Sequence, residues 1–208
     1  MNLFRKQPGQ AKKHGKLISI DSFDPDERKI HASFLAQTAA ENDLSVEHIE
    51  LQPPILDDSD LNPRAAAIFF AVEQVKQAEL IREALTLNDI VIVEGYVITN
   101  AGFCGTYFTD HLERVDFFKW VDNLSYTILN MPRTNLNIII SPDNTTKKVN
   151  PVSESFRELA KLAPNTKIIE YASGKSARLE TRNKIWELVR RIALQTNIVK
   201  TKWSSLDR

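Results

Sequence analysis

Short runs of β-branched residues, each followed by a stretch with helical periodicity, constrain this chain more than any other feature. The clearest run is Ile90-Val91-Ile92-Val93, and Ile138-Ile139-Ile140 is a second one. Runs without alternating polar residues are typical of strands in parallel sheets, because helices cover both faces of such a sheet. Strands of this kind that alternate with helices predict an α/β fold.

The other expected elements complete this pattern. Further strands are expected at 17–20, 46–51 and 167–171. Apolar residues three and four positions apart predict helices between the strands, and Pro63 suits the first turn of a long one. After Val93 we expect a loop that contains glycines. The helices are expected at 28–42, 63–87, 113–130, 153–163 and 179–196.

These elements predict a single three-layer α/β domain, with a mostly parallel five-stranded sheet flanked by helices. The domain is expected to span residues 17–196. Residues 1–16 are polar and basic and predict a flexible arm. Residues 197–208 form a tail in which Trp203 is either a docking anchor, since tryptophan is enriched at interfaces, or part of a frayed end.

The charge of the chain is unevenly distributed. There are 27 basic and 27 acidic residues, so the formal net charge is zero. Residues 1–20 carry net +5, residues 21–62 net −9 and residues 145–208 net +8. Because a nucleic-acid-binding protein is usually basic overall, we do not expect one here. The basic ends could instead contact an acidic protein partner.

Cysteine content and hydropathy exclude other classes. The chain has one cysteine, Cys104, which rules out a disulfide framework and fits a reducing compartment. No apolar run approaches the roughly 20 residues of a membrane helix. The histidines and acids show no metal-ligand spacing, so no metal site is expected. These observations lead us to expect a cytoplasmic protein that does not bind membranes.

Three segments carry a resemblance to a known family. They are residues 62–74, 88–105 and 117–140, and the last two each include an expected strand. Together they resemble thymidylate kinase, a nucleoside-monophosphate kinase with a phosphate-binding loop, over about residues 16–192. The resemblance implies a P-loop kinase fold, with ATP and Mg²⁺ as cofactors of an active member.

The phosphate-binding loop itself departs from the family pattern. That pattern needs two glycines, whose backbone N–H groups converge on phosphate oxygens. Ser22 and Glu27 stand where the glycines are expected, and Pro25 has no N–H to donate. Asp26 and Glu27 would face the phosphates, and like charges about 4 Å apart cost about 1 kcal/mol in water and about 4 kcal/mol at an effective dielectric constant near 20. The degenerate loop comprises Ser22, Phe23, Asp24, Pro25, Asp26 and Glu27.

Other phosphate-binding groups of the family are also replaced. Gln74 and Gly95 stand where the family has arginines that hold nucleotide phosphates, and neither can neutralise a dianion. The lid that follows the fourth strand in the family is shortened here to about residues 142–150. The resemblance therefore implies that ATP binding and phosphoryl transfer are lost.

Some family positions are retained. If the protein is active, the resemblance makes Arg28 and Lys29 the donor-phosphate ligands and Glu94 the group that organises Mg²⁺. Phe70 matches an aromatic residue that stacks on the base. Alternatively, Phe70 and Tyr96 could both be aromatic residues of the hydrophobic core. The nucleoside-binding candidates are Phe70, Tyr96, Thr99, Asn100 and Glu50, of which Thr99 and Asn100 could instead cap a helix.

Three functions are consistent with the sequence. The first is a thymidylate-kinase-like pseudoenzyme that acts by binding a protein or a nucleoside-like ligand, with no cofactor. The second is an active nucleoside-monophosphate kinase with an unusual loop, which needs ATP and Mg²⁺. The third is a structural subunit of a larger assembly. Since the resembled family is dimeric, a homodimer is expected as well.

Overall fold

A five-stranded parallel sheet forms the centre of the molecule. The computed structural model describes residues 14–22, 24–51, 62–142, 151–171 and 175–203. The strand order is β2-β3-β1-β4-β5, and each neighbouring pair is parallel. The predicted three-layer α/β architecture is therefore confirmed. The strands are β1 (Lys16–Ser22), β2 (Val46–Glu50), β3 (Ile90–Glu94), β4 (Leu136–Pro142) and β5 (Thr166–Tyr171).

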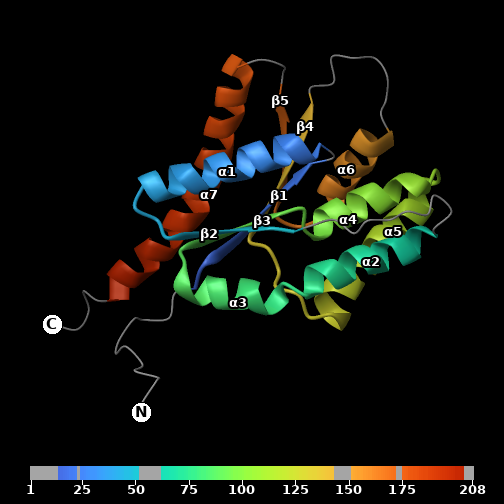
Figure 1. The fold of residues 1–208 in the computed structure, drawn as a ribbon, viewed down its shortest axis with the longest axis horizontal. Coiled ribbons are helices and arrows are strands. Elements are labelled where there is room, and N and C mark those ends of the chain that lie inside the picture. Colours follow the sequence, from blue (N-terminus) through green and yellow to red (C-terminus); the bar gives the residue numbers. More distant parts are fainter. Residues whose placement is uncertain (1–13, 23, 52–61, 143–150, 172–174, 204–208) are drawn as a thin grey trace, which may run out of the picture.

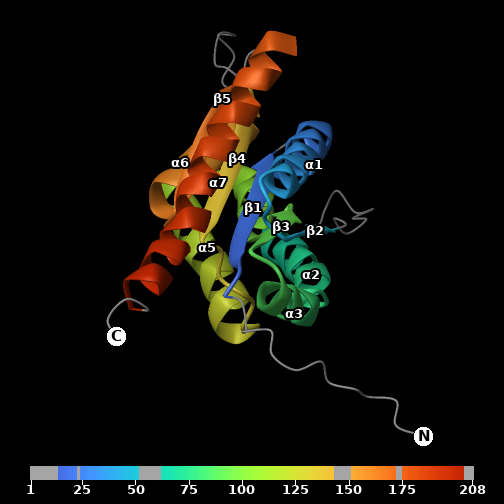
Figure 2. The same ribbon diagram turned by 90° about the vertical axis from the view of Figure 1, so that its left-hand side faces the viewer.

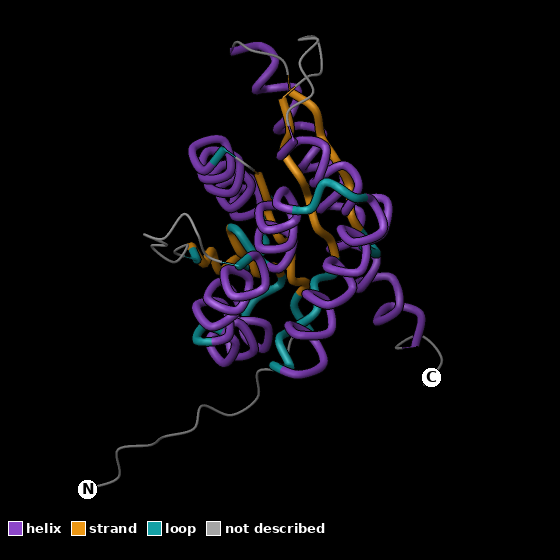
Figure 3. The backbone as a smooth tube through the Cα atoms, turned by 90° about the vertical axis from the view of Figure 1, so that its right-hand side faces the viewer, coloured by secondary structure: helices purple, strands orange, loops and turns teal. Residues whose placement is uncertain are grey.

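Helices cover both faces of this sheet, as Figures 1 and 3 show. Successive strand side chains point to opposite faces, so Leu17 packs into one core and Ile18 into the other. On the face of Ile18 lie α1 (Pro25–Glu41) and α7 (Lys175–Trp203), which run side by side in Figure 2. On the face of Leu17 lie α2 (Pro63–Val75), α3 (Ala78–Leu87), α4 (Val97–Cys104), α5 (His111–Asp122) and α6 (Pro151–Leu162).

The prediction of one long helix at 63–87 is wrong, because this segment forms two helices, α2 and α3. At the junction between α2 and α3, the N–H of Gln77 donates to the carbonyl of Gln74, three residues back, at 3.1 Å. This tighter turn ends the regular i to i−4 pattern of α2. No glycine or proline marks the junction, so the helical periodicity gave no signal of it.

Two other segments differ from the prediction. The expected loop after Val93 contains α4 and a short 3-10 helix, Gly105–Tyr107. The expected helix at 113–130 is α5 followed by a π-helix, Asn123–Ile128. In that π-helix the N–H of Leu129 donates to the carbonyl of Leu124, five residues back.

The last helix is longer than predicted. Its backbone continues to Trp203, so the predicted tail from residue 197 begins within α7. The predicted arm falls almost wholly outside the described residues, and so does the shortened lid, apart from Pro142. Within the described ranges, no helix is long and apolar enough to cross a membrane.

The carboxyl ends of three neighbouring strands bring the predicted site segments together. In the sheet register, Glu94 of β3 lies beside Ile20 of β1 and beside Glu50 of β2. The loops that follow these strands therefore meet at one edge. In open parallel sheets this edge is where ligands bind.

Candidate functional site

The first turn of α1 lies where the resemblance places the phosphate-binding loop. Asp24 is the N-cap of this helix, and its Oδ1 accepts hydrogen bonds from the N–H groups of Asp26, at 2.9 Å, and Glu27, at 3.4 Å. The N–H of Asp24 itself donates to the hydroxyl of Ser22, at 3.1 Å. Pro25 at the start of the helix has no N–H. The amides that could bind an anion at a helix start are thus bonded to the loop's own side chains.

The two acids of this turn point in different directions. Asp26 is exposed, whereas Glu27 is buried against α7. Glu27 Oε1 accepts a hydrogen bond from Arg178 of α7 at 2.6 Å. Glu27 Oε2 lies 3.4 Å from the Nε2 atom of His31. Glu27, which the resemblance places at the second glycine of the family loop, therefore links α1 to α7.

His31 is fully buried beneath this ion pair. Burial lowers its pKa, with Arg182 and Arg178 acting in the same direction and the carboxylate of Glu27 opposing them. Neither ring nitrogen makes a hydrogen bond to the residues that the structure describes. His31 is thus favoured as a neutral ring in the folded protein.

Arg28 lies at the carboxyl end of β3. Its guanidinium carbon would be 3.3 Å from a Cβ atom added to Gly95, whose φ is +71°. Its Nε atom lies 4.0 Å from Oε2 of Glu94. The other carboxylate oxygen of Glu94 is 2.6 Å from Nε2 of His48 on β2. Glu94 is therefore shared between a guanidinium and an imidazole.

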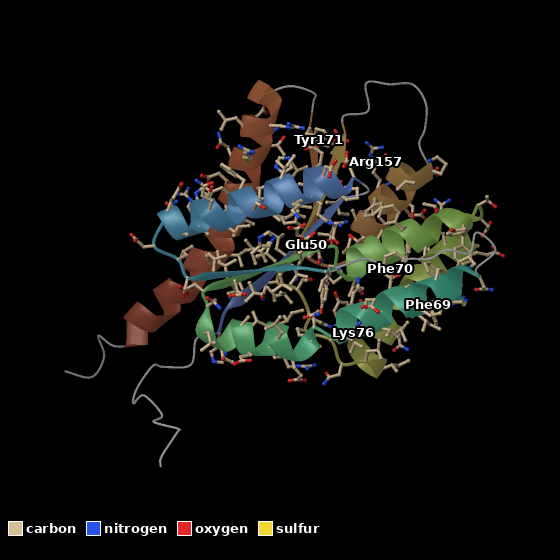
Figure 4. The ribbon with its side chains drawn as sticks, in the orientation of Figure 1. Glu50, Phe69, Phe70, Lys76, Arg157 and Tyr171 are labelled. Carbon is tan, nitrogen blue, oxygen red and sulfur yellow. The ribbon has the colours of Figure 1, made fainter. Side chains whose placement is uncertain are left out.

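Other polar groups around these residues are also engaged. Lys29 Nζ lies 3.1 Å from Oε2 of Glu50, and both side chains are well exposed. Glu50 ends β2, as Figure 4 shows. Gln74 is buried and donates from Nε2 to the carbonyl of Gly95 at 3.2 Å. Its Oε1 is buried without a hydrogen-bond partner among the described residues.

A buried carboxylate, Asp21, supports the start of α4. Its Oδ1 accepts hydrogen bonds from the N–H groups of Tyr96 and Thr99, both at 3.1 Å, and from the Thr99 hydroxyl at 2.7 Å. Its Oδ2 accepts from the hydroxyl of Ser19 at 2.6 Å. Burial raises the pKa of Asp21, while these hydrogen bonds and the charge of Arg28 oppose the rise. Asp21 thus caps α4 from a neighbouring strand.

Four of the residues predicted to bind a nucleoside lie at the start of α4 or on α2. Three of them make hydrogen bonds within the core instead. Tyr96 is fully buried, and its hydroxyl donates to the carbonyl of Pro132 at 2.9 Å. Thr99 is bound to Asp21, and Asn100 donates from Nδ2 to the carbonyl of Ala67 at 2.9 Å. These contacts favour the core alternative for Tyr96. The fourth residue, Phe70, is partly buried on α2 and is labelled in Figure 4.

The sequence did not predict the roles of Asp21 or His48. Asp21 follows a buried apolar run directly, and an acid at the end of a buried strand was the available signal. His48 lies on the same face of β2 as Val46 and residue 50, which gave no sign that it would contact Glu94. Phe23 of the degenerate loop lies outside the described residues.

The site has little capacity for metal or thiol chemistry. Among the described residues, no group of three or more histidines, cysteines and acids could hold a metal ion. Glu94, the Mg²⁺ candidate, is already bonded to His48 and paired with Arg28. Burial raises the pKa of Cys104 to about 12, so its thiol is protonated at neutral pH. Within the part of the chain that the structure describes, the residues at this edge do not fit an ATP–Mg²⁺ site of the usual kind.

Comparison with known proteins identifies the fold. No protein-family model and no curated protein matches the chain. Among solved structures, the thymidylate kinase from Candida albicans is similar, with a TM-score of 0.61 and 16% identity, over 88% of this chain and 92% of that one. The thymidylate kinase from Ehrlichia chaffeensis has a TM-score of 0.64 and 15% identity, over 84% of this chain and 98% of that one. The chain has a thymidylate-kinase-like fold.

Proposed function

We propose that this protein is a thymidylate-kinase-like pseudoenzyme, which neither binds ATP productively nor transfers a phosphoryl group. It acts instead by binding a protein or a nucleoside-like ligand. Fold alone does not determine function, so the proposal depends on the chemistry of the site. That chemistry differs from the resembled kinases at the start of α1 and at Gln74 and Gly95, three places where the resemblance expects phosphate to be held.

The start of α1 is the observation that carries the proposal. In a phosphate-binding loop, free backbone N–H groups and the helix dipole attract the anion. Here Asp24 occupies the N–H groups of residues 26 and 27 with its own carboxylate. A phosphate group would have to displace this carboxylate and then lie close to it. Repulsion between the two anions, about 4 kcal/mol per charge pair near 4 Å at an effective dielectric constant of 20, opposes that exchange.

A test combines two measurements on the full chain. Isothermal titration calorimetry with ATP–Mg²⁺ and with dTMP measures binding, and a coupled assay measures ADP release. We expect no ATP–Mg²⁺ binding in the micromolar range and no ADP release above that of the heat-treated protein. A thymidylate kinase assayed in parallel is the positive control. Turnover at ordinary kinase rates that is lost in Arg28→Ala or Lys29→Ala would overturn the proposal.

The alternative of an active kinase has one observation in its favour. Arg28 and Glu94, the residues that the resemblance links to donor phosphate and Mg²⁺, lie 4.0 Å apart at the carboxyl end of β3. An active enzyme would need ATP–Mg²⁺ to separate this pair and to draw Glu94 away from His48. In that case the ADP-release assay gives a positive result, and Glu94→Gln reduces it.

Self-association is part of the proposal, because three large apolar side chains are exposed on α2. Ile68, Phe69 and Val72 are each about half exposed, and Figure 4 marks Phe69 on this helix. Since apolar surface of this kind is typical of interfaces, we expect a homodimer. Sedimentation velocity checks it: the native chain should sediment as a dimer and Phe69→Glu as a monomer. Leu179→Glu, an exposed leucine on α7, is the matched control that should stay dimeric.

Two further expectations belong to the same proposal. The basic termini are candidate contacts for an acidic protein partner, and co-purification with and without residues 197–208 tests the tail. Unchanged partners after truncation would remove the tail from the proposal. A cytoplasmic location fits the single cysteine, which is a free, buried thiol.

A further inference from the structure

A cavity lies beneath α5, away from the loop of residues 22–28. Its volume is about 430 Å³, and it is lined by residues of α4, α5, α6 and the segment that leads into β4. Ligand pockets in proteins typically measure about 300–1,000 Å³. None of the described residues that line this cavity belongs to the start of α1 or to the carboxyl ends of β1, β2 and β3. Val97, Ile98 and Ala101 of its lining belong to α4, so the cavity adjoins the candidate site at this helix but lies apart from the phosphate-binding loop.

The walls of the cavity are apolar. Ile98 of α4, Phe118 of α5 and Leu159 of α6 are buried around it, and Leu162 at the end of α6 is half exposed. Phe118 provides an aromatic surface, and Leu162 gives the opening an apolar edge. An apolar body of about two or three aromatic rings suits a space with this volume and lining.

The opening carries charged groups that the structure holds in place. Arg133 donates two hydrogen bonds to the carboxylate of Asp122, both at 3.2 Å. The same guanidinium lies 4.2 Å from the ring centroid of Tyr126. Lys119 also lines the cavity and forms an exposed pair with Asp116, outside the lining, at 3.2 Å. Arg133 is thus held by two partners at the opening.

The cations at this cavity keep hydrogen-bond donors for an anion. The charged side chains that line the cavity are Lys119, Asp122 and Arg133, and Asp116 outside the lining balances the charge of Lys119. Asp122 already accepts from Arg133 with both oxygens, whereas a guanidinium has five N–H donors and uses two here. Further N–H donors of Arg133 and the ammonium of Lys119 can therefore bind a negatively charged group.

We propose that this cavity is a binding site for a small molecule with an apolar body of about two or three aromatic rings and one anionic group. The body packs between Phe118 and Leu162, and the anionic group lies beside Arg133 and Lys119. Aromatic carboxylates and sulfonates belong to this class. The site is independent of the proposed loss of kinase activity, because it shares no residue with the phosphate-binding loop.

The probe for this site is 8-anilinonaphthalene-1-sulfonate, which combines an apolar ring system with one anion. Fluorescence titration of the full chain should show saturable binding at a single site. Ala163→Phe, at a partly buried residue of the lining, should fill the cavity and weaken binding by at least about tenfold. Ala36→Phe, at a partly buried alanine of the other core, is the matched control and should bind like the native chain.

A second pair of variants tests the anionic group without filling the cavity. Leu162→Glu and Leu162→Gln change the same half-exposed side chain and differ by one charge. Leu162→Glu should bind the probe about threefold or more weakly than Leu162→Gln, as expected for one added like charge near the surface. Thermal unfolding of each variant checks that it folds.

The outcomes separate clearly. Weaker binding in Ala163→Phe, together with a difference between the two Leu162 variants, supports the site. Native-like binding in Ala163→Phe and in both Leu162 variants overturns it, because the probe then lies elsewhere. If Ala163→Phe does not fold, the Leu162 pair decides alone, and equal binding in that pair overturns the anionic class.

Discussion

Two of the helices that begin at the carboxyl edge of the sheet, α1 and α4, are capped by carboxylates of the chain in different ways. α1 is capped locally by Asp24, which lies partly exposed in the same turn. α4 is capped by Asp21, a fully buried residue of β1 that lies 75 residues before Tyr96. In both cases, protein carboxylates take up N–H groups that a ligand's phosphate could otherwise bind. The difference is burial, which decides how much each cap contributes to stability.

The largest expected effect is at Asp21. In Asp21→Ala, the N–H groups of Tyr96 and Thr99 and the Thr99 hydroxyl lose their acceptor in the core. We expect the free energy of unfolding to fall by about 3–5 kcal/mol, because each buried donor left unsatisfied costs about 1–3 kcal/mol. Urea denaturation followed by circular dichroism measures this loss. Asp21→Asn keeps an acceptor oxygen and should cost about 1 kcal/mol; equal losses in the two variants would contradict the role of Asp21 as a cap.

The next effect concerns the close approach between Arg28 and the backbone of Gly95. Gly95→Ala adds a methyl group at a φ of +71°, with the guanidinium carbon 3.3 Å away. We expect a loss of about 1–3 kcal/mol in the free energy of unfolding, from the backbone conformation and from this contact. The double variant with Arg28→Ala removes the contact but keeps the backbone strain. If Gly95→Ala lowers the free energy of unfolding by the same amount with and without Arg28, the contact with the guanidinium does not contribute to the loss.

A smaller effect is expected at the local cap. Asp24→Ala should lower the free energy of unfolding by about 1 kcal/mol, the usual contribution of an N-cap side chain. Asp24→Asn is the matched control and should retain most of the stability, because asparagine caps helices about as well as aspartate. Both are measured by urea denaturation under the conditions used for Asp21. If Asp24→Ala lowers the free energy of unfolding as much as Asp21→Ala does, burial does not make the Asp21 cap the more stabilising of the two.

The smallest change concerns His31, which lies under the ion pair between Glu27 and Arg178. Since burial lowers its pKa in the folded protein, the unfolded chain binds a proton more readily. Stability should therefore fall as the pH drops below the ordinary histidine value of 6.5 and should level off below the folded pKa. In His31→Leu this part of the pH dependence should disappear. Thermal unfolding between pH 7.5 and pH 5 compares the two proteins; parallel curves would show that His31 does not contribute.

Prediction from the sequence succeeded where the signal is local. The run at 90–93 predicted β3, and periodic apolar residues predicted α1, α6 and the inner part of α7, because burial of one face imposes these patterns. Boundaries and junctions were predicted less well. The turn between α2 and α3 contains no helix-breaking residue, and the segment after Val93 was expected to be a loop although α4 forms there.

In the candidate site too, local features could be predicted from the sequence and contacts between distant residues could not. The absence of glycine at Ser22 and Glu27, where the resemblance expects it, was visible in the sequence, and so was the proline that removes a donor. The contacts could not be predicted: Glu27 meets Arg178, 151 residues later, and His48 meets Glu94, 46 residues later. Such pairs depend on strand order and on how α7 packs against α1, which no local pattern encodes.

By itself, the sequence determined the class of fold and the absence of glycine from the loop between β1 and α1, because strand and helix periodicity and the residues of one loop are local properties of the chain. The tertiary structure alone decided which contacts the residues of this region make. It placed Asp21 under α4, shared Glu94 between Arg28 and His48, and left a cavity beneath α5. The physical reason is that hydrogen bonds and ion pairs between distant residues form only after the sheet register and the helix packing have brought their side chains together.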